Sequence, residues 1–376
     1  MIYLDHAATT PVAPAVADEM YAVLKNDFAN PSAQYPAGRE MAARVKRWRG
    51  TVAAALACEA GRLYFTSCGT EGDNWALRAA LWQNRHMGRH IVTTAVEHSA
   101  ILECCRQLEQ EGCSVTYVSP DQNGNISAEH VLAAVQSDTA LVSVMLVNNE
   151  LGNVYPVAEI AAGLSAKNPN TLLHTDAVQA FMKLPFGVKT LGADLVTVSA
   201  HKIGGPKGIG ALYAGPRLKN LRSFLAGGAQ ESGRRAGTEA TAQIAGFAKA
   251  VEIRSAHAAE NAAHLHELQA VARERFSAIE GVKLFPGGAD HILALSLVGW
   301  PAQNIVTDLG EQGICVSAGS ACHQGKPSHV IAALGLPPKE RAGVIRLSFG
   351  PETTKDDIDA AARALQVHRD TRFPML

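Results

Sequence analysis

The fold of this chain is decided by two segments, LLHTDAVQAF (172–181) and LVTVSAHKIGGPK (195–207). The apolar start of the first predicts a strand that stops on Asp176. The β-branched start of the second predicts a strand that stops on Ser199, just before Lys202 and a glycine-rich turn. Functional groups of open α/β sheets gather at the carboxyl ends of strands, so we expect Asp176 and Lys202 to share one site.

An acid and a lysine placed in this way suit pyridoxal phosphate. The lysine can hold the aldehyde of the cofactor as a Schiff base, and the carboxylate can keep the pyridine nitrogen protonated. Gln179, three residues after Asp176, is placed to reach the ring hydroxyl. For Asp176 and Lys202 alone, a capping aspartate and a solvated lysine remain the alternative, because strand-end acids are common caps.

The composition is typical of a well-packed enzyme, with 47% hydrophobic residues and 18% charged residues among 376. A formal net charge of −1 gives no field that would attract nucleic acid or an anionic membrane, so we expect neither as a direct partner. Since the chain contains neither a signal-peptide pattern nor a long apolar span, we predict a cytoplasmic protein. The seven cysteines include no C-x-x-C pair, which argues against disulfides and a structural zinc site, and we expect no metal.

Strand-like and helix-like runs alternate through much of the chain, which predicts an α/β fold with a mainly parallel sheet covered on both faces. A helical stretch from Thr241 to Ile279 then leads to a second group of strands, and we place a domain boundary around 250–260. The strands predicted for the first group are 63–66, 91–95, 114–118, 140–147, 172–175, 195–199 and 209–213. Those predicted for the second group are 282–285, 292–299, 314–319 and 344–349.

Polar motifs follow several of the other predicted strands. Gly69 and Thr70 stand between a strand and a helix, where backbone N–H groups and the helix dipole favour a phosphate; a plain N-cap by Thr70 fits the same pattern. His98 follows the strand 91–95 and can stack on a cofactor ring or move a proton, although a lone histidine is more often structural. Asn149 is one of three consecutive polar residues that are costly to bury without specific hydrogen bonds.

Three further motifs carry candidate functional residues. The glycine-rich loop 227–240 contains Thr238 and suits an anion, although a surface turn fits it equally well. Cys322 lies among small residues and next to His323, which favours an exposed thiol that ionises and attacks over a packed cysteine. Arg346 has apolar neighbours on a predicted strand and can fork onto a substrate carboxylate.

A series of motifs, taken together, resembles the cysteine desulfurases of the class V aminotransferase group. They keep the order of that family from residue 3 to residue 350, so the resemblance covers essentially the whole chain. Each motif is only suggestive alone, whereas the whole series in register is specific. The motifs are YLDHAATTP, NPSAQ with a following GR, GTEGDN, EHSA, VNNELG, DAVQ, SAHKIGGPKGIG, RAGT, SAGSAC and IRLSFG.

The resemblance implies a fold-type I pyridoxal-phosphate-dependent transferase that works as a homodimer. A large cofactor-binding domain, residues 13–255, would contain a mainly parallel seven-stranded sheet. A smaller α/β domain, residues 1–12 with 256–376, would carry the loop of the catalytic cysteine.

The resemblance also implies a role for each candidate residue. Lys202 resembles the Schiff-base lysine, Asp176 the partner of the pyridine nitrogen, and Gln179 the donor to the ring hydroxyl. His98 resembles the residue stacked on the ring. The phosphate ligands would be Gly69, Thr70, Ser199 and His201, with Thr238 from the other subunit; Asn149 and Arg346 would contact the substrate carboxylate, and Cys322 would be the nucleophile.

The implied activity converts L-cysteine to L-alanine and transfers the sulfur to Cys322 as a persulfide. Lys202 would move the α-proton, and His98 is the candidate acid or base for the substrate thiol. A sulfur-acceptor protein would then take the sulfur for iron–sulfur cluster assembly, thio-cofactors or tRNA thiolation. The loop that begins at Cys322 is shorter than in the iron–sulfur housekeeping members, so a tRNA-thiolation protein is as plausible an acceptor as a scaffold. The chain also departs from the family pattern at His6, Gln34 and Gly205.

Two alternative functions stay open. A selenocysteine lyase or another pyridoxal-phosphate β-lyase would use the same cofactor site, and a β-elimination would yield pyruvate and ammonia instead of alanine. A cofactor-free scaffold subunit would keep the fold without the chemistry. The joint presence of Lys202, Asp176 and Cys322 argues against the scaffold.

Overall fold

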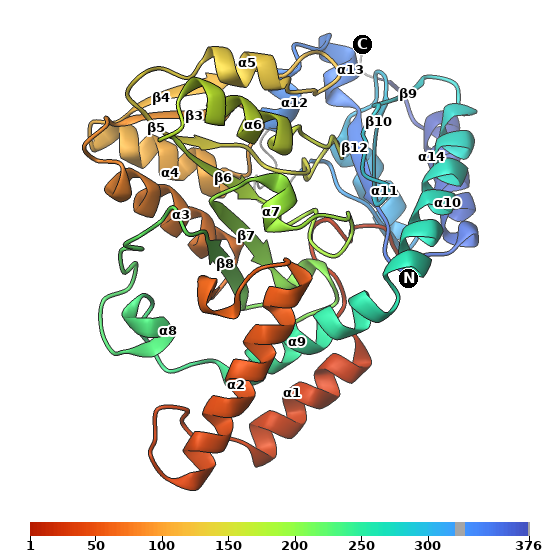
Figure 1. The fold of residues 1–376 in the computed structure, drawn as a ribbon. Coiled ribbons are helices and arrows are strands. Elements are labelled where there is room, and N and C mark those ends of the chain that lie inside the picture. The colour runs from red at the N-terminus through yellow and green to blue at the C-terminus, as the bar shows by residue number, and fades with distance from the viewer. Residues whose placement is uncertain (320–327, 375–376) are drawn as a thin grey trace.

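The centre of the fold is a seven-stranded sheet, seen in a computed structural model that describes residues 1–319 and 328–374 (Figure 1). Its strand order is β2-β8-β7-β6-β5-β3-β4. Strand β8 is antiparallel to both of its neighbours and the other pairs are parallel, which confirms the predicted mainly parallel sheet. The strands are β2 (Leu63–Thr66), β3 (His90–Thr94), β4 (Ser114–Val118), β5 (Thr139–Ser143), β6 (Leu172–Asp176), β7 (Leu195–Ser199) and β8 (Gly210–Ala214).

The inner strands are buried on both faces. Every residue of β7 is buried, with Val196 and Val198 in one hydrophobic cluster and Leu195 in another. Successive side chains of a strand point to opposite faces, so a sheet covered on both sides needs a continuous apolar run such as LVTVS. Because both faces of the sheet are covered, polar side chains reach a cavity at the ends of the strands.

Helices cover both faces of this sheet (Figure 1). Trp75 of α3 and Ile101 of α4 belong to the same cluster as Leu195, whereas Ile160 of α6 and Phe247 of α9 lie in the cluster with Val196. Helices α1 and α2 pack on α9 and project from the body of the molecule. The helices are α1 (Pro14–Asn26), α2 (Pro36–Ala55), α3 (Gly69–Gln83), α4 (Ser99–Gln110), α5 (Ala128–Ala133), α6 (Val157–Lys167), α7 (Val188–Leu191), α8 (Gln230–Gly233) and α9 (Thr241–Ala256).

The C-terminal part of the chain forms a second core together with the N-terminus. Leu4 packs there with Phe276, Leu295 and Ile345. The predicted division of the chain into two domains stays a prediction. Strand β10 (Ile292–Leu297) pairs antiparallel with β9 (Val282–Leu284) and β12 (Val344–Ser348), and β1 (Ile2–Tyr3) pairs parallel with β11 (Ile314–Cys315). The helices here are α10 (Ala258–Ser277), α11 (Ala302–Glu311), α12 (His329–Ala333), α13 (Pro338–Ala342) and α14 (Lys355–Thr371).

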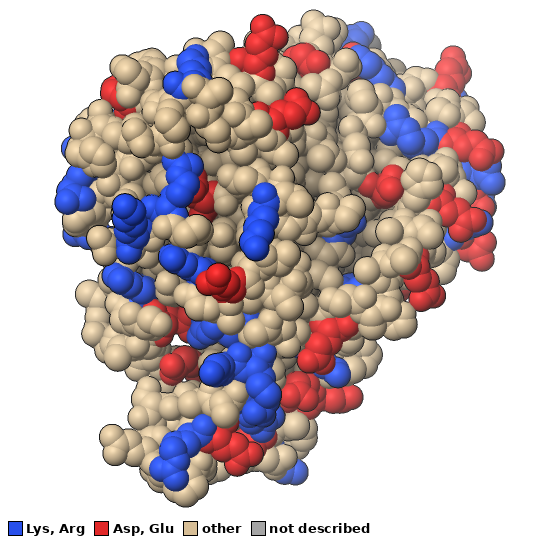
Figure 2. Space-filling view, viewed as in Figure 1, with Lys and Arg blue, Asp and Glu red and all other residues tan. Residues whose placement is uncertain are grey.

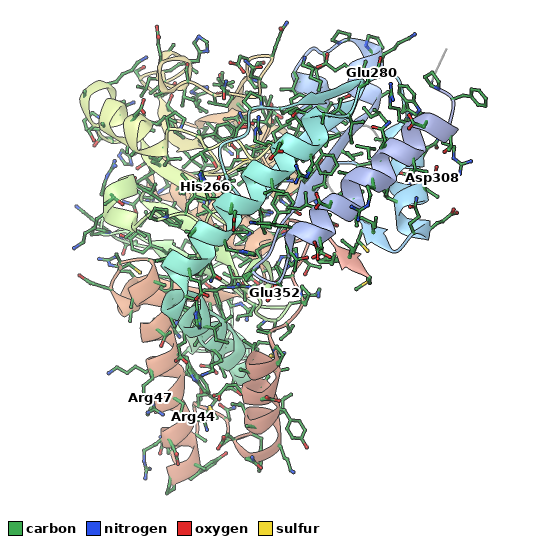
Figure 3. All side chains as sticks on the ribbon, turned by 90° about the vertical axis from the view of Figure 1, so that its right-hand side faces the viewer. Arg44, Arg47, His266, Glu280, Asp308 and Glu352 are labelled. Carbon is green, nitrogen blue, oxygen red and sulfur yellow. The ribbon has the colours of Figure 1, made fainter. Side chains whose placement is uncertain are left out.

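The predicted helical stretch from Thr241 to Ile279 is two helices. His257, with φ −115° and ψ 20°, leaves the helical region of the backbone and separates α9 from α10. Because α9 packs on α1 and α2 whereas α10 packs on α14, the break lets the chain change its packing partners (Figure 3). The predicted strand 314–319 is also shorter, since β11 ends at Cys315.

The surface carries no single dominant charge. On the face in Figure 2, basic and acidic side chains are interspersed, in keeping with the net charge of −1. Within the described ranges, no helix combines the length and the apolar character that a membrane span requires.

Candidate active site

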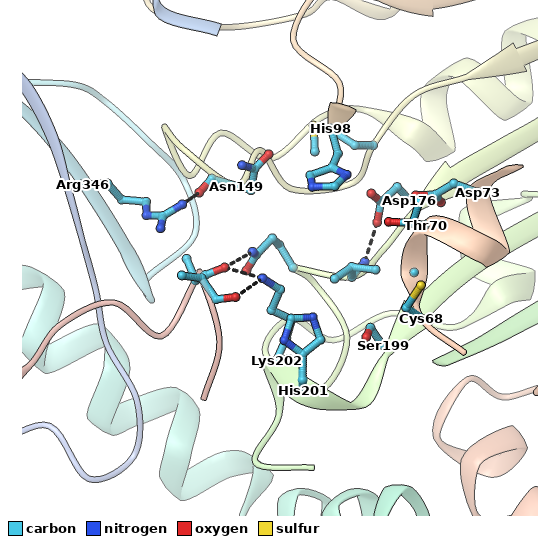
Figure 4. Close-up of a pocket in the computed structure, with 16 residues that line it drawn as sticks. Cys68, Thr70, Asp73, His98, Asn149, Asp176, Ser199, His201, Lys202 and Arg346 are labelled. Carbon is cyan, nitrogen blue, oxygen red and sulfur yellow. Dashed lines mark hydrogen bonds between the residues drawn. The ribbon is translucent and has the colours of Figure 1, made fainter. Parts of the chain in front are cut away.

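A cavity of about 250 Å³ lies where β6 and β7 end (Figure 4). Parallel strands end at the same edge of a sheet, so residues far apart in the sequence meet there. Thr238 is exposed and does not line the cavity, and Cys322 lies outside the described residues. The predicted site residues that line the cavity are Gly69, Thr70, His98, Asn149, Asp176, Gln179, Ser199, His201, Lys202 and Arg346.

Lys202 is held by the N-terminal segment. It ends a short 3₁₀ helix after β7, and its Nζ donates hydrogen bonds to the carbonyl oxygens of Ala7 at 2.6 Å and Ala8 at 2.7 Å. The Thr10 hydroxyl donates to the His201 carbonyl oxygen at 2.9 Å and accepts from the Gly204 N–H at 2.8 Å. The first residues of the chain therefore fix the loop that carries the lysine.

Asp176 is the last residue of β6 and is only 6% exposed. Its Oδ1 accepts a hydrogen bond from the Val178 N–H at 2.9 Å. Burial raises the pKa of Asp176 to about 6, against the opposing effects of the Val178 N–H and the charge of Lys202. A cation bound at this carboxyl group, such as a protonated pyridine nitrogen, would favour its ionised form.

His98 begins helix α4 as its N-cap. Its Nδ1 accepts a hydrogen bond from the Ala100 N–H at 3.2 Å, which leaves the proton of the neutral ring on Nε2. The preceding Glu97 is fully buried and accepts hydrogen bonds from the Thr94 hydroxyl at 2.8 Å and the Met145 N–H at 3.0 Å. These contacts fix the turn that presents the imidazole to the cavity.

The start of α3 offers a site for a phosphate. Cys68 is the N-cap, so the alternative of a plain N-cap by Thr70 is wrong, and Gly69 and Thr70 are the first helical residues. Their N–H groups belong to the first turn, which has no intrahelical acceptors. Ser199 Oγ is buried without a hydrogen-bond partner in the part of the chain that the structure describes. A Cβ at Gly69 would lie 3.0 Å from Val178 Cγ2, so a larger residue here would press on the Val178 side chain.

Arg346 on β12 connects the second core to the cavity. It is 2% exposed, and its guanidinium donates to the Asn149 carbonyl oxygen at 2.6 Å and to Asp5 Oδ1 at 2.6 Å. Within the described ranges, Arg346 Nε and Asn149 Oδ1 are buried without hydrogen-bond partners. Arg346 thus forms a partly buried ion pair with Asp5, and one polar atom on each of Arg346 and Asn149 is still available to a ligand.

Two departures from the family pattern have a structural reason. A Cβ at Gly205 would lie 2.8 Å from the Ala200 carbonyl oxygen, so a larger residue does not fit this loop. His6 is buried, and a Cβ at Gly350 would collide with its ring, so these two residues pack directly on each other. Gln34 is exposed and has no such constraint.

Sequence reasoning missed several residues of the cavity. Ala7, Ala8 and Met145 line it without any chemical signature in the sequence, and Cys68, a thiol directly before the predicted phosphate turn, lines it as well. Asp73 also lines it, and its position one helical turn after Thr70 was a usable signal. In the described part of the chain, Asp73, His98 and Asp176 form the one group of acidic, histidine or cysteine side chains close enough together to hold a metal ion. The expectation of no metal stays a prediction.

The chain belongs to the class-V aminotransferase family, whose model matches residues 2–361. It is 39% identical over 372 residues to the cysteine desulfurase IscS of Clostridium botulinum (strain Kyoto / Type A2), covering 97% of this chain and 93% of that protein. It is 41% identical over 364 residues to cysteine desulfurase 2 of Trichormus variabilis, covering 96% of this chain and 90% of that protein. A solved NifS-like protein superposes with a TM-score of 0.92 at 31% identity, covering 99% of this chain and 100% of that one. The predicted resemblance to cysteine desulfurases and the fold-type I architecture are confirmed.

The family implies pyridoxal phosphate, and the residues of the cavity fit this cofactor. Ser199 Oγ has no hydrogen-bond partner among the described residues, and the first N–H groups of α3 lie at a helix start, where a phosphate binds favourably. Asp176 lies at the opposite side of the cavity from Arg346 (Figure 4), and a buried carboxyl group suits a protonated ring nitrogen. The Lys202 amine reaches the same cavity.

Proposed function

We propose that this protein is a pyridoxal-phosphate-dependent cysteine desulfurase that converts L-cysteine to L-alanine and passes the sulfur to Cys322. The observation that carries the proposal is that Lys202, Asp176 and His98 line one cavity together with Arg346. The first three fit the cofactor, and Arg346 fits an amino-acid carboxylate. The similarity to cysteine desulfurases over nearly the whole chain supports the same function.

Each side of the cavity has its own task in this proposal. Gly69, Thr70, Ser199 and His201 would hold the phosphate, joined by Thr238 of a second subunit. Asp176 would hold the ring nitrogen, Gln179 the ring hydroxyl and His98 the ring face. When bound, the cofactor supplies an electron sink for the negative charge that develops on the substrate.

Lys202 is the proposed acid–base group at the substrate α-carbon. In the structure its amine donates hydrogen bonds to the Ala7 and Ala8 carbonyl oxygens. The flexible side chain of Lys202 would leave these acceptors to reach the cofactor and the substrate, and its amine would take the α-proton and later give a proton back. His98, with its proton on Nε2, is the proposed partner of the substrate thiol.

The substrate carboxylate would bind between Arg346 and Asn149. The guanidinium already donates from two nitrogen atoms to Asn149 and Asp5, which fixes its plane. Its buried Nε and the side chain of Asn149 would supply the contacts to the substrate.

The flanks of the segment that contains Cys322 support its proposed role. Ser328 Oγ donates to Glu150 Oε2 at 2.5 Å, and a Cβ at Gly319 would lie 3.2 Å from the same oxygen. His329 Nε2 lies 2.8 Å from the Glu97 carbonyl oxygen. Because Glu150 follows Asn149 and Glu97 precedes His98, both flanks are close to the residues that line the cavity.

The proposal includes a homodimer and a sulfur-acceptor protein. Thr238 is exposed and outside its own cavity, as expected for a residue that completes the site of a partner subunit. The acceptor would be an iron–sulfur scaffold or a thiolation protein, and we place the reaction in the cytoplasm. The chain would divide into a large domain, 13–255, and a small domain, 1–12 with 256–376.

The decisive experiment incubates the purified protein with pyridoxal phosphate and L-cysteine. We expect alanine in the products and a persulfide on Cys322, detected by alkylation and mass spectrometry. Pyruvate and ammonia without alanine would indicate a β-lyase, and a strong preference for selenocysteine would indicate a selenocysteine lyase. A protein that binds no pyridoxal phosphate would favour the scaffold.

A further inference from the structure

A second carboxyl group, that of Asp73, lies next to Asp176 on the side of the cavity opposite Arg346 (Figure 4). Asp73 of α3 is 1% exposed, and Figure 4 shows it beside Asp176. One ligand atom from each of Asp73, Asp176 and His98 lies within 4.8 Å of the others. Neither the proposed chemistry nor the assigned cofactor contacts use Asp73, although burying an acid is costly.

No cation faces Asp73 directly in the described part of the chain. The Thr197 hydroxyl donates to its carboxyl group, and His174 Nε2 lies 3.6 Å from its Oδ1. His174 is fully buried between Ser143 and Thr197, and burial lowers its pKa to about 3, so it is neutral. The other titratable groups around Asp73 are Asp176, Glu97, Cys68 and His98, none of which supplies a fixed positive charge.

Two buried carboxyl groups at this separation are not both ionised, because the second negative charge would have neither solvent nor a counterion. Asp176 has the Val178 N–H and the nearby charge of Lys202 to stabilise its ionised form. Asp73 has the Thr197 hydroxyl, and its Oδ1 is buried without a hydrogen-bond partner among the described residues. Of the two carboxyl groups, Asp73 is therefore the one that we expect to be protonated.

We propose that Asp73 is a positioning residue that stays protonated and shares its proton with Asp176, so that the pair presents one negative charge to the cofactor ring nitrogen. This inference rests on the proposed cofactor site. The shared proton would keep Asp176 oriented and ionised without a second repelling charge. Gly72 supports the arrangement, because a Cβ there would lie 2.7 Å from Thr197 Cγ2 and displace the hydroxyl partner of Asp73.

The apo protein tests the proton directly, without any measurement of activity. Burial and the charge of Asp176 raise the pKa of Asp73 well above its usual value, so the folded state binds a proton that the unfolded state releases. The urea midpoint of the apo protein should therefore contain a component that falls as the pH rises above the ordinary pKa of a carboxyl group. Asp73→Asn should remove that component, because an amide does not titrate. Equal pH slopes for the two proteins would overturn the proposal.

Binding of pyridoxal 5′-phosphate to the apo protein tests the pairing with Asp176. Asp73→Asn keeps a neutral hydrogen-bond donor and should retain nearly the wild-type Kd. Asp73→Leu has a similar shape but no donor, and should weaken binding by roughly tenfold to a hundredfold, the range for a lost hydrogen bond to a charged group. Asp194→Asn is the matched control, since Asp194 is a buried acid just before β7, at the opposite end of that strand.

The results of the binding test separate the two proposals. If wild type does not bind pyridoxal 5′-phosphate, the proposed function fails, while the pH slope of the apo protein still decides the state of Asp73. If wild type binds and Asp73→Asn weakens binding as much as Asp73→Leu does, Asp73 acts as an anion and the inference is wrong. Rescue by asparagine but not by leucine supports it.

Discussion

The amine of Lys202 lies 2.6 Å from the carbonyl oxygen of Ala7, a residue that precedes it by nearly two hundred positions in the chain. The N-terminal segment thus orders the proposed catalytic lysine, and Thr10 anchors that segment through its hydroxyl. Because Leu4 packs in the second core, this N-terminal segment joins that core to the proposed catalytic lysine after β7.

Thr10→Val should weaken the attachment of the N-terminal segment to the loop that carries Lys202. The substitution keeps the shape of the side chain but leaves the His201 carbonyl oxygen and the Gly204 N–H with one partner fewer, at a cost of about 1–3 kcal/mol in the free energy of unfolding. It should also slow the covalent attachment of pyridoxal phosphate to Lys202, followed by absorbance. Thr51→Val is the control, since the Thr51 hydroxyl is exposed on α2. Equal effects of the two substitutions would contradict the role of Thr10.

Arg346→Ala should destabilise the protein by roughly 1–3 kcal/mol, because Asp5 and the Asn149 carbonyl oxygen, both at least partly buried, lose the guanidinium that donates to them. Arg346→Lys should retain part of the stability but raise KM for cysteine, since an ammonium group does not reproduce the fork of the guanidinium. Urea unfolding and steady-state kinetics measure the two effects. Lys355→Ala, which breaks the exposed pair with Glu267, should change the free energy of unfolding much less, because solvent screens this pair. An unchanged KM in Arg346→Lys would remove Arg346 from the substrate site.

Glu97→Gln should change how stability depends on pH. Burial raises the pKa of Glu97 to about 8, so the folded state holds a proton that the unfolded state loses near its ordinary value of 4.5. Glu97 therefore contributes stability at low pH that is lost as the pH rises toward 8, and the variant should gain on wild type over that interval. Urea midpoints at several pH values measure the difference. Glu129→Gln, an exposed change on α5, should show no such trend, and a constant difference for Glu97→Gln would contradict the prediction.

Cys322→Ser should abolish alanine formation from cysteine while the visible absorbance of the bound cofactor remains. The persulfide should map to Cys322 and not to Cys68, although Cys68 also lines the cavity. Mass spectrometry of the alkylated protein separates the two thiols. Cys58→Ser is the control, because Cys58 lies outside the cavity and burial raises the pKa of its thiol to about 11. A sulfur adduct on Cys68 in the wild-type protein would move the nucleophile to the start of α3.

Much of the sheet could be predicted because its strands are continuous apolar runs. The predicted bounds of 63–66, 114–118 and 195–199 agree with those observed. Periodicity did not locate the break at His257, because a helix that changes its packing partners keeps its local pattern on both sides. Asp176, Lys202 and His98 could be predicted to line the cavity because Asp176 ends an apolar strand and the other two follow one, where a polar residue is conspicuous.

The sequence by itself determined the fold class and the family, and it predicted the residues proposed to bind pyridoxal phosphate, since these depend on local patterns and on motifs in order. Tertiary structure alone decided which groups contact one another. The Ala7 carbonyl oxygen on Lys202, Asp5 on Arg346 and Asp73 beside Asp176 each join elements that are distant in the sequence. Such contacts arise from the way the sheet and the second core pack. Two neighbouring acids repel each other strongly only where the fold has excluded water from both, so the repulsion between Asp73 and Asp176 depends on the tertiary structure.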